Sequence, residues 1–146
     1  MAIPIILVTH GYAAVELLNT AYMLVGKQEN IRALEFLPGE NTEILRDKIQ
    51  RTAEEMTAVV YEKDAKEKPV LVVVDVMNGS PWNATALLMR TSKDYYLISG
   101  ANVPLILNLI MERDECSNIQ SLFMSSINEA KESISYFDQE SICQRS

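Results

Sequence analysis

The sequence predicts an α/β fold: a doubly wound, mainly parallel sheet with helices on both faces. Two observations support this prediction. Short apolar runs rich in β-branched residues alternate along the chain with longer segments of helical periodicity. The apolar runs are nearly continuous, as expected for strands that are buried on both faces of a parallel sheet. The predicted element order is β-α-β-α-β-α-β-α-α, with an optional further short strand near the end of the chain.

The first half of the chain is predicted to contain two strands and two helices. Residues 3–8 and 31–38 have the composition of buried strands. A helix is predicted over 13–26, because its apolar residues fall on one stripe of a helical surface. Asn41 can cap a longer helix that runs to about Glu62. The predicted inner face of that helix consists of Ile44, Leu45, Ile49, Ala53 and Met56.

The second half of the chain repeats this alternation. Residues 69–76 are the most apolar run, which places them at the centre of the sheet. The segment 78–90 opens a third helix, in which Ser80 fits the N-cap and Pro81 the first helical position. The remaining predicted elements are a strand at 94–100 and helices at 102–113 and 117–134.

Length and composition limit the classes of protein and partner. The chain has 146 residues, 48% of them hydrophobic, and a formal net charge of −7. One domain over 1–146 is expected, and the acidic charge argues against nucleic acid and anionic membranes as partners. Cys116 and Cys143 lack metal or redox spacing, so we expect reduced thiols in a cytoplasmic protein. The chain shows no signal-peptide pattern, and no apolar run approaches the ~20 residues that span a bilayer.

Polar clusters follow three of the predicted strands, where the carboxyl ends of parallel strands meet at one edge of the sheet. Ligands of doubly wound folds bind at this edge, at the point where the strand order reverses. We therefore expect these side chains to lie close together. The clusters are Thr9-His10-Gly11, Asp75 with Asn78-Gly79-Ser80, and Ser99-Gly100-Ala101-Asn102.

His10 is the only histidine of the chain. In an arbitrary protein, the simplest interpretation would be a loop histidine at a strand end. Here Gly11 permits a close approach of the backbone, and the helix that follows directs its N-terminal amides to the same place, as in an anion site. A histidine beside an anion site can accept a phosphoryl group on a ring nitrogen or act as a general base.

Asp75 and Ser80 each have a structural and a functional interpretation. Taken alone, Asp75 is as readily an N-cap or loop residue as a carboxylate that fixes the tautomer of His10. Ser80 belongs most simply to a turn and helix start, but its hydroxyl and the adjacent amides can also hold phosphate oxygens. Trp82, the only tryptophan, is assigned to core packing rather than to docking.

Four motifs in this order and spacing closely resemble a known family. They are VTHGYAA, EFLPGEN, VVVDVMNGSPWNA and ISGANVPLILN, and they span about residues 1–115. The resemblance is to the EIIA component of the mannose/fructose/sorbose family of the phosphoenolpyruvate-dependent sugar phosphotransferase system. The last thirty residues are assigned by position only, and no EIIB domain or Ala-Pro linker follows, so we expect a free-standing EIIA subunit.

The resemblance implies a phosphotransferase that uses a phosphohistidine and needs neither metal nor cofactor. His10 would accept a phosphoryl group from the phosphocarrier protein HPr and pass it to a histidine of EIIB, and the membrane components EIIC and EIID would then carry the sugar. Asp75 would orient His10, while Gly11, Gly79 and Ser80 would bind the phosphoryl group. The family often has glycine where this chain has Asn78, and asparagine tolerates the left-handed conformation that such a loop requires.

Other functions remain open at this stage. A hydrolase could use Ser80, His10 and Asp75 as a triad, although the G-x-S-x-G elbow is absent. A nucleotide or flavin module could share the fold, but no G-x-G-x-x-G motif supports it. A regulatory phosphohistidine protein would use the same chemistry as a sugar carrier, and the identity of the sugar is not encoded in this subunit.

Residues 133–146 are predicted to form a dimerisation strand and tail. Ile134 and Tyr136 alternate with Ser133 and Ser135, a pattern of a short half-buried strand. A lone strand at the chain end needs a sheet edge to pair with. The family resemblance implies a homodimer in which this strand adds antiparallel to the sheet of the partner.

Overall fold

The computed structural model describes residues 2–145 and contains a four-stranded, wholly parallel sheet. The strands lie in the order β2-β1-β3-β4. They comprise β1 (Ile5–His10), β2 (Ile31–Phe36), β3 (Val70–Val74) and β4 (Tyr95–Ser99). The helices of the described residues are α1 (Ala13–Val25), α2 (Thr42–Val60), α3 (Ser80–Met89), α4 (Val103–Glu112), α5 (Ile119–Glu132) and α6 (Gln139–Cys143).

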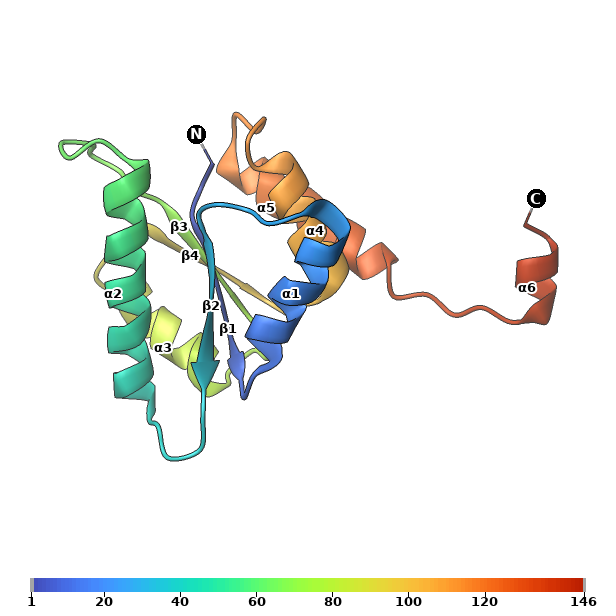
Figure 1. The fold of residues 1–146 in the computed structure, drawn as a ribbon, viewed down its shortest axis with the longest axis horizontal. Coiled ribbons are helices and arrows are strands. Elements are labelled where there is room, and N and C mark those ends of the chain that lie inside the picture. Colours follow the sequence, from blue (N-terminus) through green and yellow to red (C-terminus); the bar gives the residue numbers. More distant parts are fainter. Residues whose placement is uncertain (1, 146) are drawn as a thin grey trace.

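Helices cover both faces of the sheet, as predicted. Figure 1 shows α2 and α3 on one side and α1, α4 and α5 on the other. The alternation of side chains along β1 divides the core accordingly. Ile5 and Leu7 pack with the α1, α4 and α5 layer, whereas Ile6 and Val8 pack with α2 and α3. All five residues of β3 are buried, which explains its continuous apolar sequence.

The strand order places a topological switch point between β1 and β3. From β1 the chain crosses to β2 on one side, and it later returns to add β3 on the other side of β1. In doubly wound sheets the loops at the carboxyl ends of such neighbouring strands diverge, which leaves an open site between them. His10 is the last residue of β1 and Asp75 directly follows β3, so both lie at this point.

Several element boundaries differ from the sequence predictions. The first strand runs through His10 rather than ending at Val8, because Thr9 and His10 still pair with β2. The N-cap of α3 is Gly79 and Ser80 is the first helical residue, so the prediction of Ser80 as N-cap was wrong. Ile44 is exposed rather than on the inner face of α2. The side chain of Asn41 caps α2, as predicted, by accepting a hydrogen bond from the amide of Ile44 at 2.8 Å.

As far as residue 145, the last one described, the C-terminal segment forms no strand within this single chain, although its sequence has a strand pattern. Residues 134–138 connect α5 to the short helix α6, which the sequence analysis did not predict. Figure 1 shows this segment leaving the body of the protein, with α6 at its far end. Ile134 and Tyr136 are 79% and 82% exposed. We call residues 133–146 the C-terminal arm.

Candidate functional site

His10 and Asp75 are held together by two hydrogen bonds to one oxygen atom. The Nδ1 atom of the His10 ring lies 3.0 Å from Oδ2 of Asp75, and the backbone amide of His10 donates to the same oxygen at 3.1 Å. The other carboxylate oxygen of Asp75 accepts from the amide of Val76 at 3.0 Å. These bonds fix the ring relative to the backbone, and they leave Nε2 as the nitrogen available for chemistry.

The ionisation state of Asp75 suits a hydrogen-bond acceptor for His10. Partial burial raises the pKa of the carboxyl, but the hydrogen bonds from the ring and amide of His10 outweigh it, so the pKa lies below its usual value. Asp75 is therefore ionised at neutral pH and acts as an acceptor. A carboxylate acceptor places the proton of a neutral imidazole on Nδ1, which keeps the lone pair on Nε2.

The His10 ring is accessible at the surface. Half of its side chain is exposed, at 49%, whereas the side chain of Asp75 is 24% exposed. The ring of Phe36, from the end of β2, contacts it edge-on with centroids 5.7 Å apart. A half-exposed ring held by a less exposed carboxylate would suit a reaction with a group carried by another protein.

Gly79 packs directly against the His10 ring. A Cβ atom at position 79 would lie 2.9 Å from Cε1 of His10 and 3.7 Å from Nε2. Only glycine fits this approach without displacing the ring. Ser80 follows at the start of α3, before the first intrahelical hydrogen bond, which runs from the amide of Asn83 to the carbonyl of Gly79 at 2.8 Å. The N-terminal end of α3 therefore lies beside Nε2, where its positive partial charge favours an anion.

The loop before α3 adopts the conformation that the sequence required of Asn78. This residue has φ +67°, in the left-handed region, which asparagine reaches more easily than most residues. Asparagine at position 78 thus permits a left-handed turn in this loop.

Gly11 and Thr9 shape the other side of the site. Gly11 has φ +60°, and its amide donates to the carbonyl of Phe36 at 2.8 Å. That amide is therefore already engaged. The buried hydroxyl of Thr9 accepts from the amide of Ala14 at 2.6 Å and satisfies one of the free N–H groups of α1. Sequence reasoning missed this function of Thr9, because a capping side chain usually accepts from an amide two or three residues further on, and Ala14 lies five residues after Thr9.

The third polar cluster, residues 99–102, is hydrogen-bonded to the end of β3. The amide of Gly100 donates to the carbonyl of Asp75 at 3.1 Å, and that of Ala101 donates to Val74 at 3.0 Å. Asn102 caps α4 by accepting from Leu105 at 2.9 Å. The cluster at 99–102 thus reaches the expected edge of the sheet, where it fixes the end of β3 and starts a helix.

Three exposed apolar side chains lie close to His10 or Asp75 in the sequence. Tyr12, Val76 and Met77 are 61%, 55% and 61% exposed, and all lie within two residues of His10 or Asp75 in the chain. We call these three residues the apolar rim. Exposed apolar groups gathered around a polar centre are typical of protein interaction sites.

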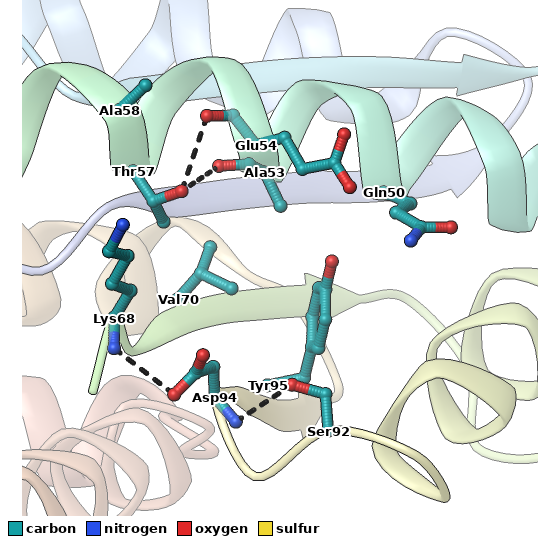
Figure 2. A pocket seen from close by; sticks show the side chains of 10 residues that line it. All are labelled: Gln50, Ala53, Glu54, Thr57, Ala58, Lys68, Val70, Ser92, Asp94 and Tyr95. Atoms are coloured by element: carbon teal, nitrogen blue, oxygen red, sulfur yellow. Dashed lines mark hydrogen bonds between the residues drawn. The ribbon is translucent and has the colours of Figure 1, made fainter. Parts of the chain in front are cut away.

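A separate cavity of about 360 Å³ lies at the opposite edge of the sheet. Figure 2 shows that it is lined by α2 and by residues at the starts of β3 and β4, including Glu54, Lys68 and Tyr95. None of its lining residues belongs to the site predicted from sequence. It therefore plays no part in the chemistry of His10.

Comparison with known proteins identifies a matching family. A family model described as the PTS system fructose IIA component (EIIA-man) matches residues 4–127. The chain belongs to this EIIA family. The matched region includes every element of the sheet and all five residues of the predicted site.

Relatives within the EIIA family extend over nearly the whole chain. The mannose-specific EIIAB component of Escherichia coli (strain K12) is 34% identical over 134 residues, which cover 92% of this chain and 39% of that protein. The chain thus spans about two fifths of that relative. The sorbose-specific EIIA component of Lacticaseibacillus casei is 28% identical, with coverage of 90% and 87%. The crystal structure of an EIIA component from Streptococcus agalactiae has the same fold, with a TM-score of 0.79, 24% identity, and coverage of 92% and 97%.

Two further observations concern the chain as a whole. Within residues 2–145, no helix has the length and apolar character that crossing a membrane requires. The same residues contain no group of three or more His, Cys, Asp or Glu side chains arranged to hold a metal ion.

Proposed function

We propose that this EIIA chain is a cytoplasmic phosphocarrier. His10 accepts a phosphoryl group from HPr and passes it to a histidine of EIIB. The membrane components EIIC and EIID then carry the sugar in as its phosphate. The observation that carries this proposal is the double hydrogen bond from His10 to one oxygen of Asp75. That arrangement favours a neutral ring with its lone pair on Nε2, beside the N-terminal end of a helix.

The transfer is a displacement at phosphorus. The Nε2 lone pair of His10 forms a bond to the phosphorus while the nitrogen–phosphorus bond of the donor phosphohistidine breaks, and the donor ring keeps that electron pair. The proton on Nδ1 of His10 stays in its hydrogen bond to Asp75. The phosphoryl oxygens are held by the Ser80 hydroxyl and the amides at the start of α3, with Gly79 and Gly11 providing the close approach. Fixed dipoles of this kind supply charge stabilisation to phosphoryl transfer without a metal.

The geometry favours this function over a serine hydrolase. In a triad the base must hydrogen-bond the serine hydroxyl. Among the described residues, the hydrogen bonds of His10 go to Asp75, and none joins the ring to Ser80. A regulatory role for the same phosphohistidine would use identical chemistry, and it would differ in the protein that receives the signal.

Labelling with phosphate tests the proposal. Wild-type protein incubated with radiolabelled phosphoenolpyruvate and the general phosphotransferase proteins should take up one label per chain, stable in base and labile in acid. His10→Ala should fold normally and take up none. An acid-stable label would point to a serine or threonine ester and would overturn the proposal. Transfer of the label to EIIB, rather than to another protein, would separate sugar transport from a purely regulatory role.

We also propose that two chains form a homodimer through the C-terminal arm. The support is twofold: β4 is an edge strand, and the arm carries apolar side chains that are half to four-fifths exposed within its own chain. The arm of each chain would add antiparallel to the sheet of the other, which gives a symmetric interface.

A further inference from the structure

We infer that Asn83 is a positioning residue for phosphoryl transfer, acting through the loop that carries Gly79. The inference rests on the proposed function of His10. It concerns a residue outside the set predicted from sequence, on the first turns of α3 and exposed to solvent.

Asn83 bonds to the loop through both its side chain and its backbone. Its Nδ2 atom donates to the carbonyl oxygen of Asn78 at 3.1 Å, and its amide donates to the carbonyl oxygen of Gly79 at 2.8 Å. The amide of Gly79 in turn donates to the carbonyl of Val76 at 3.3 Å. The peptide group between Asn78 and Gly79 is thus held at both ends, with the Asn83 side chain at its carbonyl.

The peptide group that Asn83 holds also determines how closely Gly79 approaches His10. The Cα atom of Gly79 approaches the ring so closely that an added Cβ would lie 2.9 Å from Cε1. Rotation of the 78–79 peptide would move Gly79 against the ring or away from it. It would also shift Ser80 and the first amides of α3 relative to Nε2.

The conformation of Asn78 makes this restraint necessary. A residue at φ +67° that is not glycine occupies a sparsely populated region, which persists only when surrounding bonds hold it. The α3 helix can form without the Asn83 side chain, since the backbone hydrogen bond from position 83 to Gly79 does not need it. Loss of the side chain should therefore loosen the loop while leaving the fold intact.

Asn83→Ala, with Asn108→Ala as matched control, tests the inference. Asn108 also donates through Nδ2 at 3.1 Å, to Ser126 between α4 and α5, away from the loop. Phosphoryl transfer from phospho-HPr is measured at several HPr concentrations, together with the thermal midpoint. We expect Asn83→Ala to lower kcat roughly tenfold, because small misplacements of reacting groups cost up to about 100-fold. The KM for phospho-HPr should stay within about twofold, since the apolar rim is unchanged. Asn108→Ala should transfer at the wild-type rate.

A second variant separates the hydrogen bond from the presence of a side chain. Asn83→Asp keeps the size of the residue but presents a carboxylate that cannot donate to the Asn78 carbonyl, so it too should transfer slowly. Wild-type kcat in Asn83→Ala, with His10 labelled normally, would overturn the inference and leave the proposed function standing. Equal slowing by Asn108→Ala would overturn it as well. Failure of wild-type protein to be labelled on His10 would reject both.

Discussion

A single oxygen atom, Oδ2 of Asp75, accepts hydrogen bonds from both the ring and the backbone amide of His10. The first bond sets the rotation and tautomer of the imidazole, and the second ties the carboxylate to the end of β1. Because Asp75 directly follows β3, the pair connects the ends of β1 and β3. These are the neighbouring strands between which the strand order reverses. The imidazole of His10 is thus positioned by groups at the ends of two neighbouring strands.

Asp75→Asn should slow phosphoryl transfer by on the order of tenfold to a thousandfold, because the amide can present its NH₂ group where an acceptor is needed. The thermal midpoint should change little. Single-turnover transfer from phospho-HPr is the measurement. Asp94→Asn is the matched control, since that carboxylate also accepts from a backbone amide, that of Lys68 at 3.1 Å, at the opposite edge of the sheet. Equal rates for wild type and Asp75→Asn would show that Asp75 has only a structural role in the loop after β3.

Gly79→Ala should impair transfer without strain in its own backbone. Gly79 has φ −76°, which any residue adopts, so the only obstacle is the contact with Cε1 of His10. Gly26→Ala is the complementary control: φ is +80° there, with no atom near the added Cβ. That variant should lose about 1 kcal/mol of stability and retain normal transfer. Urea unfolding and single-turnover rates distinguish the two effects, and normal transfer by Gly79→Ala would show that the ring moves freely.

Met77→Ser should weaken docking of the phosphoryl donor rather than the chemistry. The Met77 side chain belongs to the apolar rim and makes no hydrogen bond to His10. Truncating a useful interface side chain costs roughly 1 kcal/mol, so the KM for phospho-HPr should rise about fivefold with kcat nearly unchanged. Met23→Ser provides the control, since Met23 is 87% exposed on α1 but lies outside the rim. An unchanged KM for Met77→Ser would exclude the rim from the docking surface.

Sequence patterns were sufficient for the fold and for the central pair of the site. Apolar periodicity located every strand of the sheet, and the rule that parallel strands end at one edge brought His10 to Asp75. The patterns failed where polar residues continue a strand: Thr9 and His10 look like loop residues, yet they pair with Glu35 and Phe36. The polar residues at the end of β1 therefore mark the candidate site, and backbone pairing continues through them.

The positions of Asn83 and of the C-terminal arm required three-dimensional information. The bond from Asn83 to Asn78 depends on the left-handed turn at Asn78, which folds the chain back toward the helix. No spacing rule gives that geometry. In the arm, alternation of Ile134 and Tyr136 with serines predicts a strand, but the pattern does not tell whether the strand would pair within the same chain or with another.

Stability should fall as the pH rises from about 10 to about 12, partly because of Tyr61. Burial raises the pKa of Tyr61 to about 12, and the negative charge of Asp94 adds to this. Its hydroxyl donates to the carbonyl of Pro69 at 2.6 Å. In the unfolded chain a tyrosine ionises near pH 10, so between these values the folded state binds more protons than the unfolded state. The stabilisation from protonated Tyr61 is complete below pH 10 and is lost as the pH passes 12.

Tyr61→Phe tests this pH dependence. The variant should be less stable at neutral pH by about 1 kcal/mol, the usual contribution of a hydrogen bond. Its stability should decline less steeply between pH 10 and 12, although not become flat, because burial also raises the pKa of Tyr95 to about 12. Urea unfolding at intervals of pH measures both effects. A decline as steep as that of wild type would assign the alkaline loss of stability to other groups.

Deletion of residues 133–146 should weaken association of the chain without removing its chemistry. The arm exposes Ile134, Tyr136, Phe137 and Ile142 at 79%, 82%, 52% and 52%, so pairing with a second chain would remove this apolar surface from water. The proposed phosphoryl site consists of residues at the ends of β1 and β3 and at the start of α3 within one chain. Light scattering at micromolar concentration should therefore report a dimer for the full chain and a weaker or absent dimer for the truncated one, while His10 still takes up phosphate.

A full-length variant tests the side-chain contacts of the arm without removing the arm itself. The double change of Ile134→Ser and Tyr136→Ser keeps the length of the arm and its backbone donors but removes its two most exposed apolar side chains. If these side chains bury against a partner, the variant should dissociate at higher concentration than wild type, and Ser135→Ala should not. A monomeric wild-type protein would refute the dimer itself. A truncated chain that remains a tight dimer would instead place the interface elsewhere on the molecule and leave the arm without a part in it.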